Sequence, residues 1–140
     1  MRVMVLIRAS SASAADALPD SAQLEAMGRF NEALMQAGIL LAGEGVQPAS
    51  RGCRIVIDGA GRRVAGGPPA PAEDRITGFW LWEVRDMDEA LDWAMRCPAP
   101  VPGPSEIEIR PVMEAADFGT ALSPERAERT ARMREFLAGL

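Results

Sequence analysis

Glu44 is the residue best placed to do chemistry in this sequence, because it stands between two glycines, in Gly43-Glu44-Gly45, directly after a short apolar segment. Glycines leave a carboxylate accessible, or they let another stretch of backbone approach closely. A carboxylate in that position could act as a general acid or base, or it could bind a ligand. The alternative is a turn carboxylate that accepts hydrogen bonds from nearby backbone N–H groups.

Four other residues qualify as ligand-binding candidates. Arg8 directly follows an apolar segment and could anchor an anionic group through its guanidinium; an ion pair with Glu44 or Glu83 is the alternative. Glu83 lies near the end of a long apolar segment and could act together with bound water. Trp80 and Trp82 could line an aromatic pocket, or they could pack in the core or at a dimer interface.

The residue types that the chain lacks exclude several kinds of chemistry. The sequence contains no His, no Tyr and no Lys. Without His there is no imidazole base, no Ser–His or Cys–His nucleophile and no histidine metal ligand. Without Lys there is no Schiff base and no P-loop. The two cysteines, Cys53 and Cys97, have no zinc-site or CxxC spacing. We therefore expect neither a metal nor a cofactor, and any acid–base chemistry must use Asp, Glu, Cys or bound water.

Length and charge set the broad class. The 140 residues fit one domain with a real core, and the hydrophobic share of 48% is that of an ordinary globular protein. The formal net charge of −5 argues against a nucleic-acid partner. No segment approaches the roughly 20 apolar residues of a membrane span, and the apolar stretch at residues 1–7 is too short for a signal peptide. We expect a cytoplasmic protein with no membrane partner.

The candidates are positioned by elements that the apolar pattern predicts. Residues 76–84 read as a buried strand, with Trp80 and Trp82 on one face and Phe79 and Leu81 on the other. Further strands are expected at residues 2–8, 39–42 and 106–112, and a hairpin at 53–57 and 62–65 around the turn Asp58-Gly59. Helices are expected from Asp20 or Ser21 to Gly38, from Asp86 or Asp88 to Cys97, and from Ser123 to about Ala138. The core-facing stripes of the first two helices are predicted to be Leu24, Met27, Phe30 and Leu34, and Ala90, Leu91, Ala94 and Met95.

The order of these elements predicts an α+β, ferredoxin-like fold. It reads β-α-β, an inserted hairpin, β-α-β and a C-terminal helix. The first and third strands of the β-α-β units are apolar on both faces, which places them in the middle of a sheet of order 4-1-3-2. With both helices on one face of the sheet, the other face needs cover, most economically from a second copy in a two-fold dimer.

The chain resembles the YCII-related, DGPF-domain family of small bacterial proteins over about residues 1–112. The resemblance rests on the order and spacing of several segments: residues 1–8, Gly43-Glu44-Gly45-Val46-Gln47-Pro48, residues 78–84, residues 88–94, Cys97-Pro98 and residues 106–112. It implies a dimeric α+β barrel in which two ferredoxin-like sheets face each other. It also implies a domain at residues 1–113, followed by a linker and helical extension at 114–140.

This chain departs from the family pattern at two functional points. The name-giving Asp-Gly-Pro-Phe loop is replaced by Gly66-Gly67-Pro68-Pro69. Some relatives carry a His–Asp pair proposed as catalytic, and this chain has no His. The resemblance therefore implies a fold and a dimer, but no particular reaction.

Three hypotheses of function follow. The first is a small homodimeric domain that binds a small organic molecule or a partner protein, with no reaction assigned. The second is a dimeric-barrel enzyme, an isomerase, lyase or cofactor-free oxygenase, that uses Glu44 and Arg8. The third is a regulatory interaction module linked to sigma-factor-like transcription proteins, with the C-terminal helix as its contact.

Overall fold

The fold is built on a four-stranded antiparallel sheet of order β2-β5-β1-β6. The computed structural model describes residues 1–9, 18–66 and 75–140. The strands of this sheet are β1 (Arg2–Ala9), β2 (Leu40–Gly45), β5 (Ile76–Glu83) and β6 (Ser105–Pro111). Strands β1 and β5, the two that are apolar on both faces, lie in the middle, so the predicted ferredoxin-like order is confirmed.

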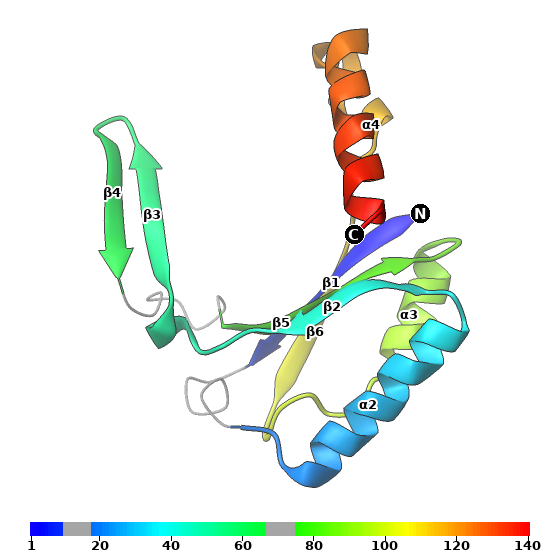
Figure 1. Ribbon diagram of the computed structural model, residues 1–140. Helices are drawn as coiled ribbons and strands as arrows, with labels where there is room; N and C mark the ends of the chain where they lie inside the picture. Colours follow the sequence, from blue (N-terminus) through cyan, green and yellow to red (C-terminus); the bar gives the residue numbers. More distant parts are fainter. Residues whose placement is uncertain (10–17, 67–74) are drawn as a thin grey trace.

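Two helices, α2 (Ser21–Gln36) and α3 (Met87–Ala94), cover one face of the sheet (Figure 1). The side chains of β1 and β5 alternate between buried and half-exposed, and the buried set faces these helices. The core includes Val3, Val5, Ile7, Phe30, Leu34, Trp80, Trp82 and Ala90. The ring of Phe30 packs edge-on against Trp80, Trp82 and Trp93, with centroid distances of 5.7, 6.4 and 6.2 Å. Both strand tryptophans therefore pack in the core of the chain, one of the places expected for them.

Across the residues that the structure describes, no helix layer covers the opposite face of the sheet (Figure 1). The strand register places Met4 opposite Leu81 and Leu6 opposite Phe79 on this face. All four side chains are half-exposed although they are apolar. We call them the open sheet face. Its edge is charged: Arg8 and Glu108 form an ion pair there, with Nη2 and Oε2 2.9 Å apart.

Two further elements rise from the sheet on the side of the open face. Strands β3 (Cys53–Asp58) and β4 (Gly61–Gly66) form a separate two-stranded hairpin, and α4 (Pro124–Ala138) forms the C-terminal helix (Figure 1). Short 3₁₀ segments, Ala49–Arg51 and Ala115–Ala121, precede the hairpin and α4. Neither the hairpin nor α4 contributes a buried residue. Ser123 caps α4 and Pro124 occupies its first turn, as the sequence predicted.

Some local predictions were wrong. Leu24 is 59% exposed, and Leu91 and Met95 are 48% and 85% exposed, because the core-facing stripe of α2 runs through Met27, Phe30 and Leu34, and that of α3 through Met87, Ala90, Trp93 and Ala94. The positive φ of the hairpin turn is at Gly61 (112°) and not at Gly59. The Asp58 side chain instead accepts a hydrogen bond from the Ala60 N–H, which closes the turn with an Asx contact. The replaced family loop, apart from Gly66 in β4, lies outside the described residues.

Candidate functional site

Residues from α2, β2 and β5, and from the loop before β6, line a pocket of about 570 Å³. This volume is in the range of small-molecule sites, about 300–1,000 Å³. The lining is mostly apolar and includes Ile7, Leu18, Pro19, Met27, Leu40, Val46, Pro48, Phe79, Trp80, Pro100 and Val101. Its polar members are Asn31, Glu44, Gln47 and Thr77. The pocket is therefore suited to a largely apolar molecule with a few polar groups.

Three glycines create the space. Gly43 lies opposite Trp80, and Gly45 lies opposite Gly78, so this glycine pair sits where two neighbouring strands would otherwise both present side chains. A Cβ atom at Gly43 would come within 2.5 Å of Trp80 Cδ1, and one at Gly78 would come within 3.1 Å of the Glu44 carbonyl oxygen. Both contacts are too close for an alanine to fit without a shift of its neighbours. The missing side chains leave room beside α2 at this end of the sheet, and the glycines line the pocket.

Asn31 is the most defined polar group in the pocket. The indole N–H of Trp80 donates a hydrogen bond to Asn31 Oδ1 at a distance of 2.9 Å. Because Oδ1 accepts this bond, the amide orientation is fixed and its NH₂ group keeps its two donors. Both residues line the pocket. A ligand that carries a hydrogen-bond acceptor could therefore be oriented by the Asn31 NH₂ group.

Glu44 is the one charged residue that the described parts of the chain contribute to the pocket lining. It lies within β2, opposite Phe79, and not in a turn. The turn alternative is therefore wrong, because β2 continues through Gly43-Glu44-Gly45 instead of ending before them. Paired residues on neighbouring strands share a face, so the Glu44 side chain leaves β2 on the side of Phe79, the open sheet face, whereas Gly43 and Gly45 border the side of α2. No basic side chain of the described residues contributes to the lining, which favours a neutral ligand over an anionic one.

The other predicted candidates are spread over the molecule. Trp80 lines the same pocket as Glu44, whereas Trp82 is fully buried in the core, and its indole N–H has no partner within the described residues. Arg8 lies at the edge of the open sheet face, where its ion-pair partner is Glu108, a residue that the sequence did not suggest for it. Glu83 lies at the far end of β5 from the pocket, with its carboxylate 3.9 Å from the N-terminal amino group. Only Glu44 and Trp80 of the five candidates meet in the pocket.

Sequence reasoning missed Asn31 and Gly78. Asn31 follows Met27 by four positions and precedes Leu34 by three, so it lies on the core-facing side of α2. A polar residue in such a place was a usable signal, because buried polar groups in proteins are almost always given a hydrogen-bond partner. Gly78 interrupts an otherwise bulky strand, and a glycine inside a strand often marks a close approach of a ligand or of another backbone.

Elsewhere, the thiol of Cys97 has an altered pKa. It is half-buried next to the end of α3, and burial raises its pKa to about 11. The thiolate is the reactive form, so this cysteine is chemically inert near neutral pH. No helix in the described parts of the chain is long and apolar enough to cross a membrane.

The four-stranded antiparallel sheet with two helices on one face defines an α+β domain of the ferredoxin-like type. The chain belongs to the YCII-related domain family, whose sequence model matches residues 1–116. The resemblance inferred from the spacing of the strand and helix motifs is thereby confirmed. No curated protein matches the chain.

Proposed function

We propose that this member of the YCII-related domain family is a homodimeric binding protein for a small organic molecule. The observation that carries the proposal is the pocket of about 570 Å³ beside Gly45, where an added Cβ would meet no atom closer than 3.9 Å, whereas Gly43 and Gly78 are held to glycine by their neighbours. Closely packed protein interiors rarely leave a space of this size unfilled. A bound ligand would fill this space.

The lining narrows the chemistry of that ligand. A neutral molecule with a broad apolar surface fits the walls, and an acceptor atom such as a carbonyl oxygen fits the NH₂ group of Asn31. A phosphate or a carboxylate is disfavoured, because no basic side chain of the described residues lines the pocket. The substrate class that we favour is thus a neutral carbonyl-containing organic molecule.

The homodimer is supported by the open sheet face. Met4, Leu6, Phe79 and Leu81 form one contiguous apolar surface across the two central strands. Contiguous apolar patches on soluble proteins generally mark a binding surface. A second copy brings an identical patch, and a two-fold interface is self-complementary by construction. In this proposal residues 1–113 form the domain that pairs, and residues 114–140 extend it.

Binding of the neutral fluorescent dye N-phenyl-1-naphthylamine tests the pocket. Gly45→Val is the blocking variant, because a Cβ at Gly45 has its nearest neighbour at 3.9 Å and so fits the fold while filling the cavity. Gly66→Val, on the hairpin and outside the lining, is the matched control. We expect the dye to bind the native protein and the control, and Gly45→Val to weaken binding at least tenfold. Equal binding by all three proteins would refute the pocket as the site.

Catalysis by Glu44 is the second candidate function. The observation that favours it is that Glu44 lines the pocket while taking part in no ion pair within the described residues. Such a carboxylate could remove a proton next to a carbonyl group of a bound molecule. Arg8, the other residue of this hypothesis, is paired with Glu108 and does not line the pocket. For any molecule found to be turned over, Glu44→Gln should lower kcat at least a hundredfold and leave the folded state intact; unchanged turnover would remove this candidate.

A further inference from the structure

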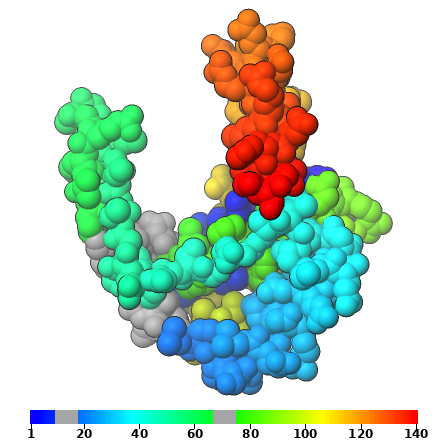
Figure 2. All heavy atoms as spheres, viewed as in Figure 1, coloured from blue at the N-terminus to red at the C-terminus, as the bar shows by residue number. Residues whose placement is uncertain are grey.

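The hairpin β3–β4 and the helix α4 stand on opposite ends of one sheet face. The hairpin follows the end of β2 and precedes the start of β5, whereas α4 follows the end of β6, next to the start of β1. Both elements rise on the side of the open sheet face, and a wide gap separates them (Figures 1 and 2). We call the space between these elements the cradle: the open sheet face is its floor, and the hairpin and α4 are its two walls.

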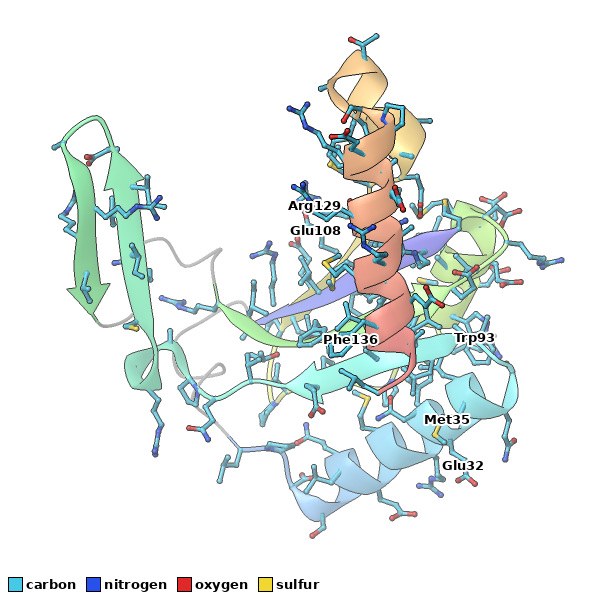
Figure 3. The ribbon with its side chains drawn as sticks, turned by 45° about the horizontal axis from the view of Figure 1, so that its top comes forward. Glu32, Met35, Trp93, Glu108, Arg129 and Phe136 are labelled. Atoms are coloured by element: carbon cyan, nitrogen blue, oxygen red, sulfur yellow. The ribbon has the colours of Figure 1, made fainter. Side chains whose placement is uncertain are left out.

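Each wall carries apolar side chains that stay exposed among the residues that the structure describes. Ile55 lies opposite Val64 in the hairpin, and Ile57 lies two positions further along the same face. Their side chains are 61%, 74% and 63% exposed. On α4, Phe136 is 68% exposed (Figure 3), and the neighbouring Met133, Leu137 and Leu140 are exposed as well. A two-stranded hairpin on its own is at best marginally stable in water, so the hairpin needs a covering partner.

Charge indicates what that partner is. The segment that forms the hairpin and its approach, residues 51–66, holds four arginines and one acidic residue, Asp58. The rest of the chain holds eleven basic and nineteen acidic residues. A basic hairpin on an acidic protein is complementary to the body of another copy of the same chain.

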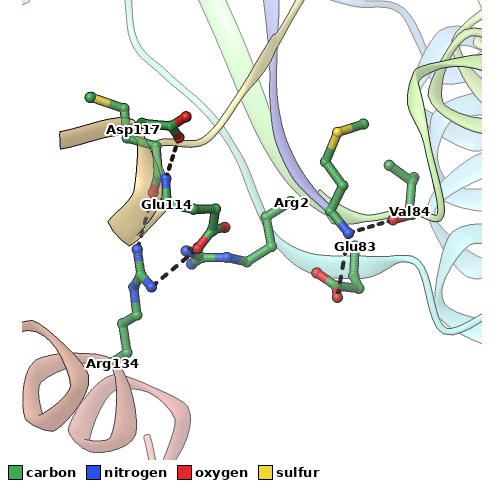
Figure 4. Close-up of polar contacts among 8 residues, drawn as sticks. Arg2, Glu83, Val84, Glu114, Asp117 and Arg134 are labelled. Carbon is green, nitrogen blue, oxygen red and sulfur yellow. Dashed lines mark hydrogen bonds and ion pairs between the residues drawn. The ribbon is translucent and has the colours of Figure 1, made fainter. Parts of the chain in front are cut away.

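Acidic and basic groups pair at the end of the sheet where the C-terminal part of α4 lies (Figure 4). Glu83 lies 3.9 Å from the N-terminal amino group. Glu114 accepts from Arg2 at 3.3 Å and from Arg134 at 3.4 Å, and Arg134 also donates to the Met113 carbonyl oxygen at 3.2 Å. These contacts fix the course of α4 relative to the sheet.

We propose that a second copy of this chain fills the cradle, with the hairpin of each copy packed along α4 of the other. A two-fold axis that runs across the strands reverses the strand direction, so it brings the hairpin end of one sheet to the α4 end of the other. Stacked sheets lie about 10 Å apart. The hairpin is about 20 Å long and α4 about 22 Å, so two elements that rise from facing sheets overlap side by side. The hairpin then meets the apolar row of α4. This inference rests on the homodimer of the proposed function and deepens it.

Disulfide trapping between two singly substituted proteins tests the arrangement. In a Cys53→Ser, Cys97→Ser background, Ile55→Cys protein is mixed with Phe136→Cys protein and oxidised with glutathione disulfide. We expect a covalent dimer that contains one chain of each kind. Arg54→Cys is the matched control, because Arg54 lies next to Ile55 on the opposite face of the hairpin and should give at least tenfold less of the mixed dimer. Circular dichroism verifies that each variant is folded.

Three outcomes would overturn the proposal. A native mass that shows a dimer without any mixed covalent product refutes the exchange of arms but leaves the homodimer standing. Self-linked Ile55→Cys dimers as the main product place hairpin beside hairpin and refute the direction of the axis. A monomeric native protein refutes both the packing of the hairpin on α4 and the homodimer. The dye-binding experiment tests the pocket separately.

Discussion

At the scale of single residues, the pocket depends on side chains that are absent. Gly43 and Gly78 line it because a Cβ at either position meets Trp80 or the backbone of Glu44. The sequence indicated the importance of Gly43-Glu44-Gly45, since a carboxylate between two glycines is an unusual strand ending. Gly78 also carried a signal, as a glycine inside a bulky strand, but its partner Gly45 could not be found from the sequence, because the two meet only through the pairing of two strands that are far apart in the chain.

Gly43→Ala should lower the free energy of unfolding by about 1–3 kcal/mol, because the added Cβ lies 2.5 Å from Trp80 Cδ1 and the indole must move. Gly28→Ala is the matched control. Gly28 lies within α2 with nothing within 4 Å of an added Cβ, so that substitution should raise the stability by about 0.5–1 kcal/mol. Urea unfolding followed by tryptophan fluorescence measures both. A neutral Gly43→Ala would contradict the close packing on Trp80.

Two substitutions of Asn31 separate its structural role from its binding role. Asn31→Ala leaves the indole N–H of Trp80 without its acceptor and should cost about 1–3 kcal/mol of stability. Asn31→Asp keeps an acceptor for that N–H but has no NH₂ group, so it should lose ligand binding while losing less stability. Urea unfolding and a binding titration report the two effects. Equal ligand binding by Asn31→Asp would show that the NH₂ group does not contact the ligand.

The Cys97 thiol should make the protein less stable as pH rises above 9. Its pKa is about 11 in the folded chain and 9.0 for an ordinary thiol, so between these values the folded state keeps a proton that the unfolded state has released. Stability is therefore fully present below pH 9 and is lost as pH rises toward 11. The chain has no Tyr and no Lys, which leaves this window almost free of other titrations. Urea unfolding between pH 8 and 11 should show the decline in the native protein, and a flatter profile in Cys97→Ala; the same slope in both would be the contrary result.

At the scale of elements, the sequence predicted the strands and helices better than their edges. The strand at residues 76–84 and the helix that begins after Ser123 were found within a residue or two, because bulky apolar runs and a Ser-Pro start are strong local signals. Strand β2 was predicted to end before Gly43, since glycine is a poor strand former, yet pairing with β5 carries it to Gly45. Tertiary pairing decided that boundary. Tertiary packing also decided which helix residues are buried, because Leu24 and Leu91 match a helical period but face solvent.

Capping of α3 offers a test at this scale. The sequence left Asp86 and Asp88 as alternatives, and the structure shows that the Asp86 side chain accepts from the Glu89 N–H at 2.9 Å. Asp86→Ala should therefore cost about 1 kcal/mol, whereas Asp88→Ala, within the first turn, should cost less. Thermal unfolding of the two variants gives the comparison. A larger loss of stability for Asp88→Ala than for Asp86→Ala would contradict Asp86 as the N-cap of α3.

At the scale of the whole molecule, the strand order followed from which strands are apolar on both faces, and it is β2-β5-β1-β6 as expected. The open sheet face followed from the same alternation, because two helices can cover only one face. The pocket could not be predicted, since it is formed by residues of five separate segments, among them Ile7, Asn31, Gly45, Gly78 and Val101. The positions of the hairpin and of α4 relative to the sheet could not be predicted either, because neither element contributes a buried residue whose pattern would indicate a packing partner.

The mass of the native protein in solution tests the central claim, that a second copy covers the open sheet face. Light scattering at micromolar concentration should give twice the 15.0 kDa of one chain. Leu81→Glu, which puts a charge in the middle of that face, should give the mass of a single folded chain, whereas Leu91→Glu, an exposed position on α3, should leave the dimer intact. A native protein that is monomeric, or a Leu81→Glu variant that remains a dimer, would contradict the account.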